Sequence, residues 1–234
     1  SVLLAVVLMI IPTDARSDTQ NRSREWRFDV FLDEREIGRH MFRLNETSGK
    51  SILISEVDLK VKFLFITAFD YQHSNVEVWR NGCLESIDAT TNSNGKRFEV
   101  RGQRDDGAFQ LETQDGVGSL EECVRSFAYW DRELLQQERL LNSQTGEYLE
   151  VDIRRLEPST MVLDDAEIEV ERFGLTAKGM DITLCYDSQT GQWVALDSIV
   201  KGGRLLRYRR NTGTSDAVTS LAGVSGADQH ASLR

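Results

Sequence analysis

Hydrophobic and polar residues alternate with a period of two along most of this chain. Between Glu56 and Phe65 every second residue is apolar, and the residues between them are mostly charged. Side chains on a β-strand point alternately to the two faces of a sheet, so this pattern predicts a strand with one buried face and one wet face. The same period recurs around residues 26–32, 37–44, 84–91, 149–153, 168–170, 180–186 and 205–209.

Tight-turn sequences separate the predicted strands at regular intervals. Asn81-Gly82, Asn94-Gly95, Asp106-Gly107 and Asp115-Gly116 each combine residues that tolerate positive φ, as two-residue hairpins require. Turns spaced in this way predict an antiparallel meander. We therefore predict a mainly β fold, in which a curved antiparallel sheet forms a lipocalin-like barrel or half-barrel around a cavity. A two-sheet β-sandwich is the alternative.

One segment departs from the strand pattern. Asp131 is a good N-cap, and the residues after it carry leucines at helical spacing. The sequence therefore predicts one short helix from Arg132 to Leu141.

The strand from Phe69 to Trp79 has an unusual face. The odd-numbered positions share one side of the strand, and they combine aromatic rings with an imidazole, an amide and a carboxylate. Such a mixture suits the wall of a cavity better than a plain apolar core, because ligand pockets are mostly apolar with a few polar anchors. The candidate cavity face consists of Phe69, Tyr71, His73, Asn75, Glu77 and Trp79.

His73 is also a candidate general base, because histidine titrates near neutral pH. Glu77 lies four residues further along the same strand, about 13 Å away at the usual rise per residue, so the two cannot bond directly. Any acid–base chemistry needs a carboxylate from a neighbouring strand. The competing interpretation is that both side chains satisfy buried polar groups, and on this reading the chain has no catalytic residue. His40, on an apolar face, is expected to be structural.

The two ends of the chain differ in composition from the middle. Residues 2–11 form an unbroken apolar run, which is too short to span a membrane but has the length of a signal-peptide core. We expect a signal peptide over residues 1–17, incomplete at its N-terminus, with a buried apolar strand or helix as the alternative. Residues 25–210 then form a single β-rich domain, and residues 211–234 a disordered tail. The protein is expected to be exported, to the periplasm of a Gram-negative bacterium.

Export permits disulfide bonds, and the chain has three cysteines. Cys83 and Cys123 both lie near predicted strand ends, and they are the expected pair. Cys185 lies within a strand and is expected to be a small buried thiol. No metal-binding or haem-binding spacing of Cys or His occurs, so no cofactor and no metal are expected.

Charge narrows the range of partners. The net charge is −10 and the pI is about 4.9, whereas nonspecific nucleic-acid binding needs a basic surface. We therefore expect no nucleic-acid partner. The residues after the N-terminal run contain no second long apolar stretch, so the mature protein is not expected to be an integral membrane protein. Protein partners are not indicated.

Several short pieces together resemble an uncharacterised family of exported bacterial β-rich proteins, a domain of unknown function. The resemblance covers roughly residues 25–210 and implies a periplasmic β-rich domain, but it supplies no catalytic residue. The end of the chain from Leu184 to Tyr208 is more loosely similar to curved-sheet lipoprotein carriers. The pieces that carry the family resemblance are residues 26–33, 37–38, 71–73, 77–79, 82–84, 127–130, 140–142, 145–146, 202–206 and 208.

These observations favour a periplasmic binding or carrier protein. Its expected ligand is a small apolar or amphipathic molecule, of which lipids are one class, held against the 69–79 face. The alternatives are an acid–base enzyme that uses His73 with a carboxylate, and a structural or protein-interaction module.

Overall fold

A computed structural model describes residues 22–212 of the chain, except residues 64–65 and 201. The described residues form a single 14-stranded antiparallel sheet, in which consecutive strands are neighbours from β8 back to β1 and from β14 back to β9. The first half comprises β1 (Arg22–Leu32), β2 (Arg35–Thr47), β3 (Lys50–Phe63), β4 (Ile66–Arg80), β5 (Cys83–Ser93), β6 (Lys96–Asp105), β7 (Ala108–Thr113) and β8 (Gly116–Leu120). The second half comprises β9 (Arg139–Leu141), β10 (Tyr148–Leu163), β11 (Ala166–Ala177), β12 (Met180–Asp187), β13 (Trp193–Val200) and β14 (Arg204–Arg210).

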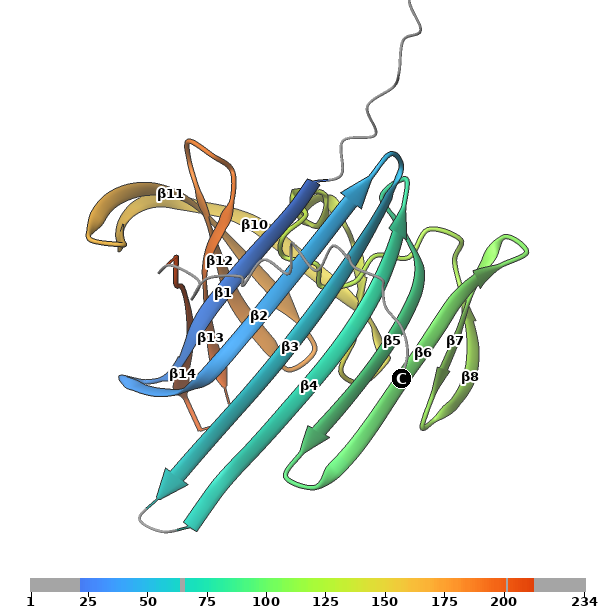
Figure 1. Cartoon of the computed structure of the whole chain (residues 1–234), viewed down its shortest axis with the longest axis horizontal. Coiled ribbons are helices and arrows are strands. Elements are labelled where there is room, and N and C mark those ends of the chain that lie inside the picture. Colours follow the sequence, from blue (N-terminus) through green and yellow to red (C-terminus); the bar gives the residue numbers. More distant parts are fainter. Residues whose placement is uncertain (1–21, 64–65, 201, 213–234) are drawn as a thin grey trace, which may run out of the picture.

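The first and last strands join the two halves into one sheet. Strand β1 pairs with β14 from Phe28↔Arg210 to Leu32↔Leu206, and Figure 1 shows the blue strand β1 and the red strand β14 side by side. The edges of the sheet are β8 and β9, so the sheet curves without closing. The predicted curved-sheet fold is therefore correct in its half-barrel form, and the β-sandwich alternative is wrong.

The predicted hairpin turns set the register. Asn81-Gly82, Asn94-Gly95 and Asp106-Gly107 have positive φ at both residues, as expected for tight turns between twisted strands. At Asp115-Gly116 only the glycine has positive φ. The meander from β4 to β7 therefore follows from local sequence.

The predicted helix is largely wrong. Only Arg132–Gln136 is helical, as one 3₁₀ turn (η1) whose N-cap Asp131 accepts a hydrogen bond from the Glu133 backbone N–H. The chain is extended again at Gln137, and Arg139–Leu141 is strand β9. Leu140 and Leu141 are buried as strand residues, because packing against the sheet outweighs their helical spacing.

The residues between β8 and β10, numbers 121–147, lie against the inner face of the sheet, and we call them the inner segment. Leu134 and Leu140 of this segment pack with Phe28 of β1 and with β11–β13. Val124 and Leu141 pack with β4–β7 on the other side. The inner segment thus fills much of the concavity and provides the core that joins the two halves.

Two sequence predictions lie outside the described residues. The predicted signal peptide, residues 1–17, is one, and the predicted tail is the other except for residues 211–212, which belong to no strand. Within the described part of the chain, no helix has the length and apolar character needed to cross a membrane.

Candidate functional site

Strand β4 carries polar side chains into the interior, as the alternation predicts. His73, Asn75, Glu77 and Trp79 are buried, while Ser74 and its even-numbered neighbours are more exposed. Three of these buried side chains are polar and lie at successive inward positions of one strand. The sheet therefore places a polar stripe in its own interior.

Neighbouring strands add to the stripe through the register of the sheet. His73 lies opposite Thr91 of β5, and Asn75 lies opposite Ser55 of β3. His40 of β2 shares with His73 a common partner on β3, Val57. Residues opposite each other in a sheet share a face, so these polar groups all point to the concave side.

The polar stripe and the inner segment enclose a small cavity of about 80 Å³. Larger hollows of about 490 and 550 Å³ lie over β5–β7 and β3–β5, and they are wide open to solvent. The small cavity is the one that gathers buried polar side chains. It is lined by His40, Phe42, Leu53, Ser55, His73, Asn75 and Glu77 from the sheet, by Phe127, Ala128, Tyr129, Trp130, Asn142, Ser143 and Gln144 from the inner segment, and by Met180.

His73 is fixed in one tautomer by a chain of hydrogen bonds. The Thr91 hydroxyl donates to the Gln144 carbonyl over 3.3 Å, so its oxygen is left to accept the His73 Nδ1–H at 2.9 Å. The Nε2 of His73 is then an acceptor and faces the Ser143 hydroxyl oxygen at 3.4 Å. Burial lowers the pKa of His73 to about 4, so the imidazole is neutral near pH 7.

Glu77 is a buried carboxyl group surrounded by donors. Asn75 Nδ2 donates to one oxygen at 2.9 Å and Trp79 Nε1 to the other at 3.0 Å, and the Ser126 side chain bonds to it as well. Burial raises the pKa of Glu77, while the three hydrogen bonds act in the opposite direction. His73 bonds to Thr91 and Ser143, whereas Glu77 accepts from Asn75, Trp79 and Ser126, so the two do not form a hydrogen-bonded pair.

Three residues of the cavity lining each have one buried polar atom without a hydrogen-bond partner among the described residues. These atoms are His40 Nδ1, Asn75 Oδ1 and Trp130 Nε1. The other ring nitrogen of His40 bonds to the Ser55 hydroxyl at 2.7 Å, and burial lowers the pKa of this histidine well below its usual value. Buried polar groups are normally hydrogen-bonded, so three unpaired atoms on one cavity are unusual.

An apolar cluster adjoins the polar cavity on the inner face. Its buried members are Val30, Ile37, Val57 and Leu59, and its half-buried members are Leu32, Val61, Phe69, Tyr71, Leu206 and Tyr208. The Phe69 and Tyr71 rings are stacked at 6.1 Å.

Tyrosines connect this cluster to the cavity. Burial raises the pKa of Tyr71, and the nearby hydroxyls of Tyr208 and Tyr129 raise it further. Tyr129 lines the cavity, and the Tyr208 ring lies 5.6 Å from that of His40. The inner face thus offers a polar cavity beside an apolar surface.

The inner segment is covalently attached to one wall. Cys83 at the start of β5 forms a disulfide with Cys123, as the sequence led us to expect, while Cys185 is free. The Leu84 backbone N–H also donates to the Val124 carbonyl at 2.9 Å. The segment that covers the cavity is therefore fixed where it leaves β8.

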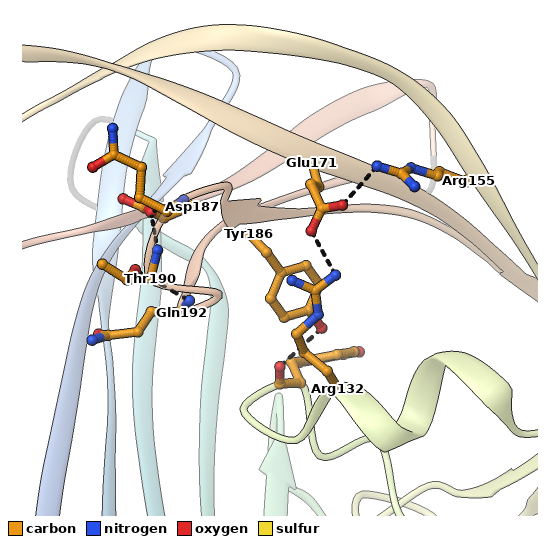
Figure 2. Close-up of polar contacts among 9 residues, drawn as sticks. Arg132, Arg155, Glu171, Tyr186, Asp187, Thr190 and Gln192 are labelled. Carbon is orange, nitrogen blue, oxygen red and sulfur yellow. Dashed lines mark hydrogen bonds and ion pairs between the residues drawn. The ribbon is translucent and has the colours of Figure 1, made fainter.

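Polar contacts hold the same segment to the opposite wall (Figure 2). Arg132 forms an ion pair with Glu171 of β11 at 2.6 Å, and Glu171 also binds Arg155 of β10 at 2.7 Å. The Arg132 guanidinium lies 5.0 Å from the Tyr186 ring centre, and the Tyr186 hydroxyl donates to the Tyr129 carbonyl. Tyr129 and Trp130 are thereby positioned over the cavity from both sides.

The predicted 69–79 face divides into three parts. His73, Asn75 and Glu77 line the cavity, and Phe69 and Tyr71 belong to the apolar cluster. Trp79 does not line the cavity: it packs in the core beside Leu84 and donates to Glu77.

Sequence reasoning missed the half of the cavity that the inner segment provides. The available signal was the aromatic run Phe127-Ala128-Tyr129-Trp130, which contributes four consecutive lining residues. The described part of the chain contains no group of three or more His, Cys, Asp or Glu side chains placed to hold a metal ion.

Comparison with known proteins supports the fold without adding an activity. Residues 28–211 match a family described as a domain of unknown function (DUF6134). The crystal structure of a β-barrel-like protein of the domain of unknown function DUF1849 from Brucella abortus is similar, with a TM-score of 0.57 and 11% sequence identity, over 82% of this chain and 97% of that one. No functionally curated protein matches the sequence.

Proposed function

This chain belongs to the DUF6134 family of domains of unknown function, and we propose that it is a binding or carrier protein for a small amphipathic molecule. The observation that carries the proposal is the inner face of the sheet, where the polar cavity adjoins the half-buried apolar cluster. An amphipathic ligand needs both environments side by side. Pockets that are mostly apolar with few polar anchors are typical of small-molecule sites.

Each part of the site has a distinct role in this proposal. The polar end of the ligand enters the cavity between Asn75 and Trp130, which have unpaired hydrogen-bonding atoms. The apolar end lies along Phe69 and Tyr71, which are only half-buried and so remain accessible. Burying apolar surface contributes about 25 cal/mol per Å², so contact with this cluster stabilises the bound ligand.

Native mass spectrometry tests the proposal on gently purified protein. We expect a bound small molecule at one per chain, which organic solvent extracts. In a second measurement, Phe69→Ser lowers the affinity for a fluorescent alkyl probe at least tenfold, because an inner apolar contact is lost. The matched control is Val76→Ser on the outer face of the same strand, where Val76 is 40% exposed. Equal effects of the two substitutions, or no binding of any amphiphile, contradict the proposal.

We also propose that the protein functions outside the cytoplasm, in the periplasm of a Gram-negative bacterium. The Cys83–Cys123 disulfide supports this, since such bonds persist in oxidising compartments. Cell fractionation followed by thiol alkylation is the test: we expect periplasmic protein with only Cys185 reactive. Cytoplasmic protein with three reactive thiols contradicts it.

An enzyme that uses His73 is the second candidate, and one contact favours it. The Ser143 hydroxyl oxygen lies 3.4 Å from the unprotonated Nε2 of His73. In this tautomer the imidazole can accept the hydroxyl proton, as the activation of a serine nucleophile requires. A serine-reactive fluorophosphonate probe that labels the protein, but not the Ser143→Ala variant, would establish this chemistry. Without labelling, the contact is structural and attaches the inner segment to β4.

A further inference from the structure

We infer that the cavity selects an uncharged polar group that has both a hydrogen-bond donor and an acceptor, such as a hydroxyl or a primary carboxamide. This inference rests on the proposed function and specifies the ligand class of the same site.

Charge on the lining disfavours an anionic group. No lysine or arginine is among the described residues that line the cavity, so a carboxylate or phosphate finds no counter-charge there. His40 and His73 are neutral near pH 7, because burial lowers the pKa of both. The acidic lining residue, Glu77, adds no positive charge, and its oxygens already accept hydrogen bonds from Asn75 and Trp79. Burying an unpaired charge is strongly unfavourable.

Hydrogen-bond complementarity distinguishes between cationic, anionic and uncharged ligand groups. Asn75 Oδ1 is an unpaired acceptor and Trp130 Nε1 an unpaired donor. An ammonium group satisfies Asn75 but has no lone pair for Trp130, and a carboxylate satisfies Trp130 but has no hydrogen for Asn75. A hydroxyl or carboxamide carries both a donor and an acceptor. His40 Nδ1 adapts to either role, because the Ser55 hydroxyl can donate to or accept from its other ring nitrogen.

The size of the cavity fits a group of this kind. A volume of about 80 Å³ corresponds to about two or three water molecules at their share of liquid volume. A hydroxymethyl or carboxamide group is of this size, whereas a sugar or a phosphate diester is larger. The rest of the ligand must therefore lie outside the cavity, along the apolar cluster.

Three ligands of equal chain length provide the test: 1-decanol, decanoate and decylammonium, each added to the full chain at pH 7.5 below its aggregation threshold. Isothermal titration calorimetry is expected to give at least tenfold tighter binding of 1-decanol than of either ion, because each ion leaves one buried polar atom of the cavity without a partner. Either ion binding as tightly as 1-decanol overturns the inference and leaves the proposed function standing. If none of the three ligands binds, both the inference and the proposed function are contradicted.

The Trp130→Phe variant tests whether the Trp130 indole N–H is the donor to the ligand. It removes the indole N–H and keeps an aromatic ring, so we expect affinity for 1-decanol to fall about tenfold while decylammonium is unaffected. Tyr148→Phe is the matched control, because it removes a hydroxyl that bonds to Glu121 away from the cavity. Circular dichroism melts establish that both variants fold. An unchanged 1-decanol affinity in Trp130→Phe, or an equal loss in Tyr148→Phe, overturns the inference.

Discussion

Glu77 is held inside the protein by donors from two parts of the chain. Asn75 and Trp79 come from the same strand, and Ser126 comes from the inner segment. The alternation of β4 predicts that Glu77 points inward, but it cannot name Ser126, which lies far away in sequence. At the scale of single residues, the sequence predicts which face of the sheet a side chain lies on, whereas tertiary packing determines its hydrogen-bond partners.

The substitution Glu77→Gln tests this arrangement. The amide replaces one acceptor oxygen by a donor that faces another donor, so we expect the free energy of unfolding to fall by about 1–3 kcal/mol. Urea denaturation at pH 8 measures it. Glu56→Gln on the exposed face of β3 is the control, with an expected change within about 0.5 kcal/mol. A comparable loss at both sites would contradict the role assigned to Glu77.

His73 makes stability depend on pH in a definite direction. Its pKa is about 4 in the folded protein against 6.5 for the free side chain, so between these values the unfolded chain binds the proton and the folded protein does not. The free energy of unfolding therefore decreases as pH falls from 6.5 to 4, by about 3 kcal/mol from this residue. Above pH 6.5 its contribution is complete.

The variant His73→Gln removes this titration and keeps hydrogen-bonding atoms. We expect its unfolding free energy, measured in urea, to fall less steeply than that of the wild type between pH 6.5 and 4, by about 1 kcal/mol per pH unit. Above pH 7 the two curves run parallel, which serves as the internal control. Equal slopes below pH 6.5 would show that His73 titrates normally.

At the scale of elements, local signals placed the hairpins and misplaced the helix. Asn94-Gly95 closes its hairpin whatever surrounds it, because both residues adopt positive φ. The segment after Asp131 has a real cap, yet it completes only one 3₁₀ turn. Short helices are marginal alone, so burial of Leu140 and Leu141 in a strand decides the outcome.

The disulfide fixes the inner segment, and its loss should weaken the fold. The double variant Cys83→Ser/Cys123→Ser removes the disulfide, which joins two residues 40 positions apart in the sequence. We expect the free energy of unfolding to fall by about 2–4 kcal/mol in urea. Cys185→Ser, at the free thiol, is the control and should change stability by less than about 1 kcal/mol. Equal losses would mean that the bridge contributes nothing of its own.

At the scale of the whole molecule, one pairing turns two meanders into one sheet. Strands β1 and β14 are neighbours although nearly the whole domain separates them in sequence. Asp33, in the turn after β1, also forms an ion pair with Arg204 of β14 at 3.0 Å. Without this pairing the inner segment would lack one of the walls that it contacts.

Engineered cross-linking tests this strand order. Phe31 and Arg207 are direct partners across β1 and β14, and directly paired residues lie close enough for a disulfide. In a Cys185→Ser background, Phe31→Cys/Arg207→Cys should cross-link under mild oxidation, as peptide mass spectrometry detects. Asp197 lies one strand beyond Arg207, about 10 Å from Phe31, so Phe31→Cys/Asp197→Cys should not. The reverse result would contradict the order β1–β14–β13.

The sequence alone determined what depends on short range. Alternation set the inward face of β4, paired turn residues set the hairpins, and these imply a curved antiparallel sheet. Only the tertiary structure decided which residues meet inside that sheet. Ser143 reaches His73 across 70 residues, and the aromatic run at 127–130 forms the other wall of the cavity. Such contacts arise when the chain buries apolar surface as a whole, and no local pattern records them.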